Sequence, residues 1–204
     1  MKLYYSPNTC ATADHIVLEW IGKPYETRKL SREDRSQPAF RALNPAGAVP
    51  VLEHDGWILT QNAAILGYLI DLYPESRLGG DGSPKERAEV NRWLAFVNSD
   101  VHPAFKPLFG ATAYLEASAA EATKQQARTT LRTLFARADA QLSGRDWLTG
   151  TRSVADPYLY VTLRWARGTG VDLSGLDNLA RFVAIMEADP AVQRVLEAEG
   201  LARA

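Results

Sequence analysis

Cys10 is the residue best placed for chemistry by its type and position, because it lies where a loop meets an expected helix. A thiolate there would feel the helix dipole and the unpaired N–H groups of the first turn, which can lower the thiol pKa from about 8.5. The alternative is a buried, unreactive thiol of the kind common in protein cores. Ala13 stands where a Cys-x-x-Cys pair would have its second thiol, so one chain cannot carry dithiol redox chemistry.

Val49 and Pro50 form a second candidate site, where a turn leads into an expected strand. A cis bond before proline costs only about 0.5–1 kcal/mol. Such a bond would leave the backbone groups of Val49 free to pair with an extended, peptide-like ligand. The alternative is a trans proline that opens an edge strand.

Gln61 and Asn62 follow Thr60 at the expected start of a helix. The free N–H groups and the dipole at a helix N-terminus favour a carboxylate, and the two side chains can add hydrogen bonds. The alternative is a plain N-cap supplied by Thr60. Together with Cys10 and Val49, this segment indicates a short peptide ligand that carries a thiol and a carboxylate.

The elements that must position these residues alternate between strand and helix over residues 1–75. Period-two patterns predict strands over 2–5, 25–30, 49–53 and 57–59, the last two joined by an Asp-Gly hairpin. Apolar residues at helical spacing predict helices over 11–22 and 61–73, and the polar segment 31–43 fits a further helix. The order βαβαββα indicates a small α/β domain.

The remainder of the chain has the patterns of helices. Residues 76–83 are rich in Gly and Ser and predict a linker between residues 1–75 and an all-helical domain over 84–204. Helices are expected over 84–110, 117–143, 155–168, 175–188 and 190–199. Ser153 and Asp156 have the spacing of a capping box and are expected to start a buried helix, which is a structural role.

The composition excludes several classes of function. The 204 residues are 46% hydrophobic and 23% charged, with a net charge of −1, which gives no reason to expect nucleic acid or an anionic membrane as partner. No run approaches the roughly 20 apolar residues of a membrane span, and the opening MKLYYSP lacks the apolar core of a signal peptide. A single cysteine fits a reducing compartment, so we expect a cytoplasmic protein, and no metal site is expected.

Several motifs together resemble those of the glutathione S-transferases, in particular the bacterial beta class. They are residues 1–7 with Cys10 and 15–16, the segment NPAGAVP at 44–50, and residues 59–65, 102–109, 153–156, 163–166 and 199–201. The likeness covers nearly the whole chain. It implies a thioredoxin-like N-terminal domain, an all-α C-terminal domain and a homodimer in which the first domain of one chain contacts the second domain of the other.

The resemblance also implies roles for the candidate residues, with glutathione as co-substrate. Cys10 would contact the glutathione sulfur or form a mixed disulfide with it, and His102 would reach toward that sulfur from the helical domain. Val49, before a cis Pro50, would pair with the cysteinyl backbone of glutathione.

Other residues would hold the two ends of the ligand and the second substrate. Gln61 and Asn62 would take the γ-glutamyl end, while Arg32 or Arg35 would meet the glycyl carboxylate. A further glutathione contact is Tyr5. The candidates for an apolar second-substrate pocket are Phe105, Phe109, Tyr114 and Trp165. For each aromatic residue the alternative is core packing.

This sequence departs from the beta-class pattern at four places. It has Ala11 for a common Ser, Gln61-Asn62 for a usual Glu followed by Ser or Gly, Ala95 for an Asn, and Pro103 for a Lys after the active-site His. The missing Glu weakens the counter-charge for the ammonium group of glutathione, and Ala95 removes a polar group expected to face the partner chain.

The function expected from the resemblance is an enzyme that binds glutathione as its thiolate. The enzyme would conjugate the sulfur to hydrophobic electrophiles, or exchange it with disulfides, with positive potential and donors supplied by the first helix and His102. The alternative is a non-catalytic protein of the same fold that carries apolar ligands or docks another protein. The departures at Gln61-Asn62 and Pro103 are the main support for that alternative.

Overall fold

The computed structural model describes residues 1–202, and its first part is built on a four-stranded mixed sheet. The strands are β1 (Lys2–Tyr5), β2 (Glu26–Lys29), β3 (Val51–His54) and β4 (Trp57–Thr60). Their order is β2-β1-β3-β4; β1 runs parallel to β2 and antiparallel to β3, and β3 pairs with β4 through the expected hairpin. The four expected strands are confirmed within two residues at each end.

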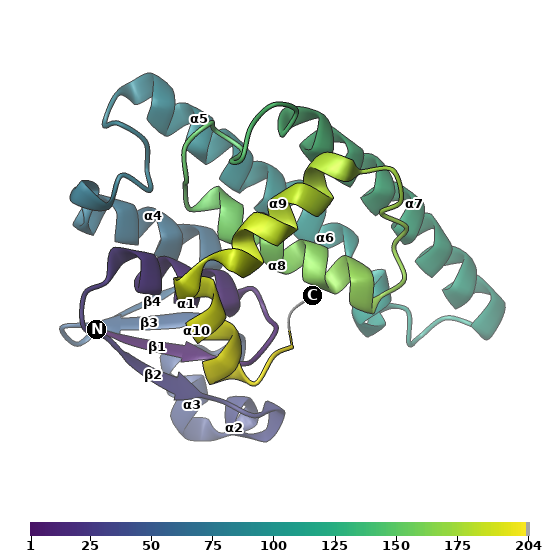
Figure 1. Ribbon diagram of the computed structural model, residues 1–204. Helices are drawn as coiled ribbons and strands as arrows, with labels where there is room; N and C mark the ends of the chain where they lie inside the picture. The colour runs from purple at the N-terminus through teal and green to yellow at the C-terminus, as the bar shows by residue number, and fades with distance from the viewer. Residues whose placement is uncertain (203–204) are drawn as a thin grey trace.

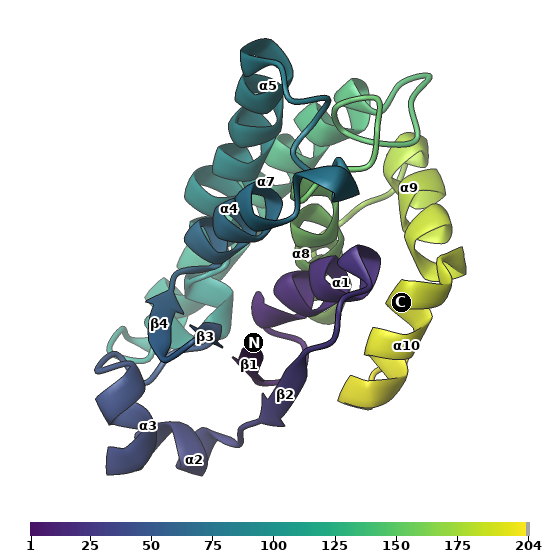
Figure 2. The same cartoon turned by 90° about the vertical axis from the view of Figure 1, so that its left-hand side faces the viewer.

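Helices cover both faces of this sheet, as the period-two pattern of β1 requires. On one face, Leu3 and Tyr5 belong to the large core that includes α1 (Ala11–Ile21) and α4 (Asn62–Leu72). On the other face, Tyr4 packs against Phe40 of α3 (Pro38–Leu43). Figure 2 shows α2 and α3 on the side of the sheet away from α1.

The segment expected to form one helix over 31–43 forms two. The helix α2 (Arg32–Ser36) begins with a capping box between Ser31 and Asp34, and ends before Pro38, the first residue of α3. Proline lacks the N–H that would continue the preceding helix, so it starts a new one.

The second part of the chain is helical (Figure 1). It follows the short 3₁₀ turn η1 (Pro74–Ser76) and contains α5 (Pro84–Ala95), η2 (Phe96–Val101), α6 (His102–Ala104), η3 (Pro107–Ala111), α7 (Ala117–Gln141), α8 (Ala155–Gly168), α9 (Asp177–Ala188) and α10 (Pro190–Glu199). The helix expected over 84–110 is therefore interrupted by the π-helical turns η2 and η3. None of the helices in residues 1–202 is both long and apolar enough to cross a bilayer.

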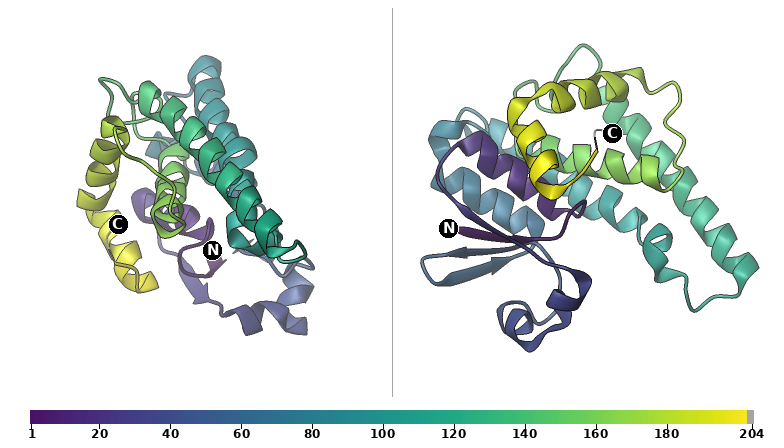
Figure 3. Two further views of the ribbon diagram at one scale, coloured as in Figure 1. Left: turned by 90° about the vertical axis from the view of Figure 1, so that its right-hand side faces the viewer. Right: turned by 60° about the horizontal axis from the view of Figure 1, so that its bottom comes forward.

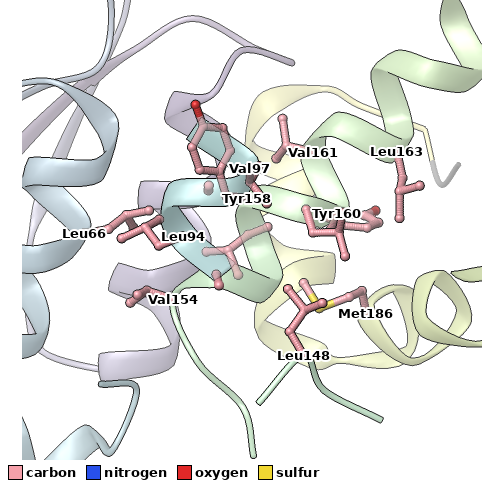
Figure 4. Close-up of a cluster of buried hydrophobic side chains, with 14 of the residues drawn as sticks. Leu66, Leu94, Val97, Leu148, Val154, Tyr158, Tyr160, Val161, Leu163 and Met186 are labelled. Carbon is pink, nitrogen blue, oxygen red and sulfur yellow. The ribbon is translucent and has the colours of Figure 1, made fainter. Parts of the chain in front are cut away.

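The helix α8 lies at the centre of this second part, with eleven of its residues buried. Its side chains meet those of α4, α5 and α9 in the cluster of Figure 4. The large core runs without interruption from the sheet through α1 into α8. The two parts of the chain thus share one hydrophobic core.

The capping box expected at the start of α8 is only half formed. The Asp156 carboxylate accepts from the Ser153 backbone N–H at 2.8 Å, as predicted. The Ser153 hydroxyl, however, donates to the same carboxylate at 2.9 Å instead of accepting from the Asp156 N–H. Asp156 also accepts from the Leu148 N–H at 2.9 Å. Asp156 is fully buried, so its carboxylate is stabilised by every hydrogen-bond donor nearby. This explains why the Ser153 hydroxyl donates to Asp156 instead of accepting from its backbone N–H.

The last helix, α10, returns to the first part of the chain and packs against α1 (Figures 2 and 3). Glu199, near its end, is almost fully buried. Its carboxylate accepts from the Asn8 N–H at 3.2 Å and the Thr12 hydroxyl at 2.8 Å, and lies 3.0 Å from His15 Nδ1. The loop before α1 is therefore held by the C-terminal helix.

Candidate functional site

A cleft of about 720 Å³ lies where the first part of the chain meets the helical part. Its walls come from the loop before α1, from α2, from the turn before β3, from the start of α4, and from η2, α6, η3 and α8. The lining residues are Asn8, Thr9, Cys10, Arg35, Asn44, Ala46, Ala48, Val49, Pro50, Thr60, Gln61, Asn62, Asn98, His102, Phe109, Tyr158 and Trp165. The structure thus brings together most of the residues that the sequence indicated.

Cys10 lines the cleft at the start of α1, but its thiol is not activated. Burial raises the pKa of Cys10 to about 12, and the nearby Asp14 acts in the same direction. Burial also raises the pKa of the Asp14 carboxyl well above its usual range. The Cys10 thiol points to the Val49 carbonyl oxygen, 3.7 Å away, as a neutral donor would. The expectation that the helix dipole lowers this pKa is wrong, because desolvation of the thiolate outweighs the dipole.

The turn before β3 places Val49 against the cleft. The Val49–Pro50 bond is cis, as the sequence predicts. Asn44 organises the turn: its side chain donates to the Ala48 carbonyl at 2.8 Å and accepts from the Ala46 N–H at 3.1 Å. Within residues 1–202, the N–H of Val49 has no hydrogen-bond partner. It is free to pair with an extended ligand.

Gln61 and Asn62 lie at the start of α4, where they have different environments. Gln61 is exposed and adopts φ 76°, an uncommon backbone conformation for a residue other than glycine, and it is the N-cap in place of Thr60. Asn62 is buried, and its amide donates to the Cys10 carbonyl at 3.1 Å and to Asp14 at 2.6 Å. The Asn62 amide therefore forms hydrogen bonds within the protein, at the base of the cleft. This corrects the expectation that it binds the γ-glutamyl end of a ligand.

The structure distinguishes the two arginines that the sequence left as alternatives. Arg35 lines the cleft, and its Nε is buried without a hydrogen-bond partner in the described part of the chain. Arg32 is exposed at the start of α2 and does not line the cleft. The turn at Gly47 packs closely against α2. If Gly47 had a side chain, its Cβ would lie only 3.0 Å from the Arg35 carbonyl oxygen. Arg35 supplies the cation of the cleft.

His102 lines the cleft from the helical part of the chain, at the start of α6. Burial, with Lys106 second, lowers its pKa below the usual 6.5, so the imidazole is neutral near pH 7. This corrects the expectation that His102 supplies positive potential. Its Nδ1 is hydrogen-bonded to the Tyr158 hydroxyl, and its ring lies edge-on to Trp165 with centroids 4.8 Å apart. The opposite nitrogen, Nε2, has no hydrogen-bond partner within residues 1–202.

An aromatic wall closes the helical side of the cleft. Phe109 is 52% exposed and lies edge-on to Trp165, with centroids 5.3 Å apart. Phe105 is fully buried and stacks behind Phe109, so it supports the wall without lining the cleft. The wall offers one apolar face to a second substrate.

Two of the predicted aromatic residues lie away from the cleft. Tyr114 is 84% exposed in the turn after η3 and does not line the cleft. Tyr5 points from β1 into the core, where its ring lies 5.1 Å from that of His15. The period-two pattern of β1 turns Tyr5 toward α1, which corrects its assignment as a glutathione contact.

Eight lining residues were not among the site residues expected from the sequence. They are Asn8, Thr9, Asn44, Ala46, Ala48, Thr60, Asn98 and Tyr158. Asn98 lies four residues before His102, a spacing that places two helical side chains on one face and could have indicated it. Tyr158 follows the capping box inside an apolar run, so its type and spacing match a core residue. Only the tertiary structure shows that its hydroxyl reaches the cleft.

No cluster of three or more His, Cys, Asp or Glu residues that could hold a metal ion is found in residues 1–202. The groups with potential for chemistry that line the cleft include Cys10, His102, Arg35 and the free backbone N–H of Val49.

Comparisons with known proteins give one consistent result. Residues 3–77 match the family model of the glutathione S-transferase N-terminal domain, and residues 119–198 match that of the C-terminal domain. Glutathione S-transferase GST-4.5 of Xanthomonas campestris pv. campestris is 56% identical over 98% of this chain and 100% of its own.

Solved structures agree with these matches. A glutathione S-transferase from Xylella fastidiosa superposes with a TM-score of 0.96 at 53% identity, over 98% of this chain and 99% of its own. A sphingomonad glutathione S-transferase complexed with glutathione has a TM-score of 0.86 at 38% identity, over 99% and 100% of the two chains. A bacterial beta-class enzyme of Sphingomonas chungbukensis gives 0.87 at 34% identity, with the same coverage.

Proposed function

Because this chain belongs to the glutathione S-transferase family, we propose that its cleft binds glutathione and transfers the glutathione sulfur to an apolar electrophile. The observation that carries the proposal is the layout of the cleft. A free backbone N–H, a cation, a helix start, the Cys10 thiol, the His102 imidazole and the aromatic pair of Phe109 and Trp165 all line it.

The polar side matches the parts of an extended tripeptide. The N–H of Val49 would pair with the cysteinyl carbonyl, which places the ligand's thiol near Cys10 and His102. Arg35 would meet the glycyl carboxylate through a charge-assisted bond. The first N–H groups of α4 and the Gln61 side chain would hold the γ-glutamyl end.

Conjugation uses the glutathione thiol as nucleophile. The S–H proton passes to a base, the thiolate forms a bond to the electrophilic carbon, and the leaving group departs with its electron pair. The neutral Cys10 thiol would donate a hydrogen bond to the sulfur instead of competing as a nucleophile. An apolar electrophile would lie against Phe109 and Trp165.

Thiol–disulfide exchange is the second candidate activity, because Cys10 lines the same cleft. It requires a Cys10 thiolate, which a pKa of about 12 makes scarce at neutral pH. We therefore rank conjugation first. The non-catalytic carrier is not favoured, since two relatives that match over 98% of this chain, at 56% and 33% identity, are glutathione S-transferases by name.

We further propose a cytoplasmic homodimer that removes electrophilic compounds, with a glutathione-binding domain over 1–75, a linker over 76–83 and a helical domain over 84–204. Support for the dimer comes from two exposed apolar side chains: Trp57 on the edge strand β4 is 51% exposed, and Leu72 at the end of α4 is 36% exposed. Light scattering of Trp57→Glu should give a smaller mass than the unmodified protein. A monomeric mass for both Trp57→Glu and the unmodified protein would contradict the proposed dimer.

The experiment that tests the function is a titration of the reduced protein with glutathione by calorimetry, followed by rates with 1-chloro-2,4-dinitrobenzene. We expect binding between micromolar and millimolar concentrations, together with turnover. Phe109→Ala should raise KM for the aryl halide several-fold, while Tyr114→Ala, on the same segment but outside the cleft, should leave it unchanged. Absence of glutathione binding at several millimolar would overturn the proposal.

Intact mass after exposure to glutathione disulfide separates the two activities. A stable adduct absent from Cys10→Ala would favour thiol exchange. Conjugation without such an adduct would leave Cys10 as a hydrogen-bond donor.

A further inference from the structure

Tyr158 connects the two sides of the cleft through a buried hydroxyl. The residue is 1% exposed and lies on α8 among side chains of α4, α5 and η2 (Figure 4). Three polar side chains reach its oxygen: His102 through Nδ1, Asn98 through Oδ1 at 3.4 Å, and Asn62 through its amide. The Tyr158 hydroxyl is therefore part of a buried hydrogen-bond network. The donor and acceptor groups of His102, Asn98 and Asn62 determine where its proton lies.

The orientation of Asn62 is determined by Cys10. One terminal atom of the Asn62 amide lies 3.1 Å from the Cys10 carbonyl oxygen. A carbonyl oxygen can only accept, so this atom is Nδ2, which also donates to Asp14 at 2.6 Å. The amide oxygen of Asn62 is therefore the terminal atom turned away from the Cys10 carbonyl, and Asn62 also contacts Tyr158. This assignment holds whether Asp14 is protonated or ionised.

The single proton of Tyr158 must then satisfy an acceptor oxygen. Both Asn62 Oδ1 and Asn98 Oδ1 face the hydroxyl, and neither can donate to it. If Tyr158 gave its proton to His102, the amide oxygens of buried Asn62 and half-buried Asn98 would face an oxygen without a hydrogen. If Tyr158 donates to an asparagine, its oxygen accepts from His102, and Nδ1 of the imidazole carries the hydrogen.

We propose that Tyr158 is a positioning residue that holds His102 in the tautomer with its hydrogen on Nδ1, so that Nε2 offers a lone pair to the glutathione thiol. The inference rests on the proposed function for the identity of the thiol. His102 then acts as the base of the reaction. Its Nε2 accepts the S–H proton, the electron pair of the S–H bond stays on sulfur, and the imidazolium keeps its Nδ1–H bond to Tyr158.

The charges around His102 agree with this role. Lys106, one turn further along the chain, and burial both keep the imidazole neutral, the form that can accept a proton. Its other neighbours are the ring of Trp165 and the hydroxyl of Tyr158, whose own pKa is raised by burial first and by Cys10 and Asp14 next. Tyr158 therefore remains a neutral phenol over the range in which His102 titrates.

Nitrogen-15 NMR of the free protein tests the tautomer without glutathione. At pH 8, long-range ¹H–¹⁵N correlations distinguish a protonated from an unprotonated ring nitrogen. The chain has three histidines, and the set of signals that disappears in His102→Gln is assigned to His102. We expect hydrogen on Nδ1, and loss of this preference in Tyr158→Phe. Hydrogen on Nε2 in the unmodified protein would overturn the inference.

Kinetics provide the second readout. Tyr158→Phe should lower kcat for conjugation by about tenfold, with KM for glutathione changed less than twofold. This is less than the about 10²- to 10⁴-fold that a general base contributes, because the variant keeps His102 and loses only its positioning. The acid limb of the pH profile should move to lower pH, because the imidazolium loses its acceptor. Unchanged kcat and an unchanged limb would overturn the inference.

Tyr160→Phe is the matched control. Tyr160 is equally buried on the same helix, but its hydroxyl meets Arg164 at 3.2 Å, and it does not line the cleft. Its loss should leave both kcat and the pH profile unchanged. If Tyr158→Phe fails to fold, the spectrum of the unmodified protein still decides the tautomer. If the unmodified protein does not bind glutathione, the proposed function fails, whereas the spectrum still reports on Tyr158.

Discussion

The indole N–H of Trp165 donates to the Asn8 carbonyl oxygen at 2.9 Å. This bond joins the central helix α8 to the loop that ends at Cys10, so the helical part helps to shape that loop. Trp165→Phe keeps an aromatic ring and removes the donor. We expect a loss of about 1 kcal/mol in the free energy of unfolding from the missing bond, measured in urea, and a higher KM for glutathione.

Trp93→Phe is the control for the change in ring size. Trp93 is also buried, but its Nε1 has no hydrogen-bond partner in the described part of the chain. Replacing it removes an unsatisfied donor, so Trp93→Phe should cost less than Trp165→Phe. Equal costs would mean that the bond to Asn8 adds nothing to stability.

The reactivity of Cys10 should increase only at high pH. With the pKa raised to about 12, chiefly by burial, the thiol remains protonated at neutral pH. Alkylation by iodoacetamide should therefore be slow and should keep rising up to pH 10, with no plateau. The chain has no other cysteine, so intact mass reports this site alone. A plateau below pH 8 would mean that the dipole of α1 prevails over burial.

Asp156 should contribute strongly to stability at low pH. Its carboxylate accepts from three buried donors on Leu148 and Ser153, so at pH 5 Asp156→Ala should lower the free energy of unfolding by about 3–5 kcal/mol. Burial raises its pKa to about 6, above the unfolded value of about 3.9. The native state therefore binds the Asp156 proton more tightly than the unfolded state does. The stabilising contribution of Asp156 to folding decreases as the pH rises from about 4 through 6.

Urea unfolding at pH 5 and 7.5 measures both effects, and the cost of Asp156→Ala should be smaller at pH 7.5. Asp177→Ala is the control, because Asp177 is exposed in the first turn of α9 and should cost under about 1 kcal/mol. Equal costs for Asp156→Ala and Asp177→Ala would contradict the prediction.

Arg35 and Arg32 should differ in glutathione binding although both lie on α2. Arg35→Met removes the cation that lines the cleft, and a charge-assisted bond is worth about 1.5–3 kcal/mol, or roughly 10- to 100-fold in Kd. Arg32→Met, outside the cleft, should change Kd less than about twofold. Calorimetry with glutathione compares the two variants. A larger loss in Arg32→Met would move the carboxylate site to the start of α2.

The strands and most helices of this fold could be predicted because residues close together in the sequence determine where they begin and end. The strands of the sheet follow from alternation and from the Asp55-Gly56 turn, and the ends of α1 and α10 follow from Gly22 and Gly200. The interruption of the helix over 84–110 has a local signal as well, because Pro103 and Pro107 lie within it and lack the N–H that would continue the helix. The π-helical form of the turns at 96–101 and 107–111 could not be predicted from any spacing in the sequence.

The site was predicted where a residue type carries its own chemistry. Cys10, Val49, Gln61 and His102 all line the cleft. The electrostatics were not predicted, because the pKa values of Cys10 and His102 depend on how deeply folding buries them. Asn62 shows the same limit: its amide could face a ligand or the floor, and only the position of Asp14 decides.

The bonds of Glu199 to Asn8 and Thr12 have a consequence for how this chain unfolds. The bonded residues are 187 and 191 positions apart in the sequence, so the first part of the chain cannot unfold without releasing the last helix. Heating should produce one calorimetric transition instead of two. A chain cut between residues 76 and 83 should remain a noncovalent pair of fragments that separate and recombine together.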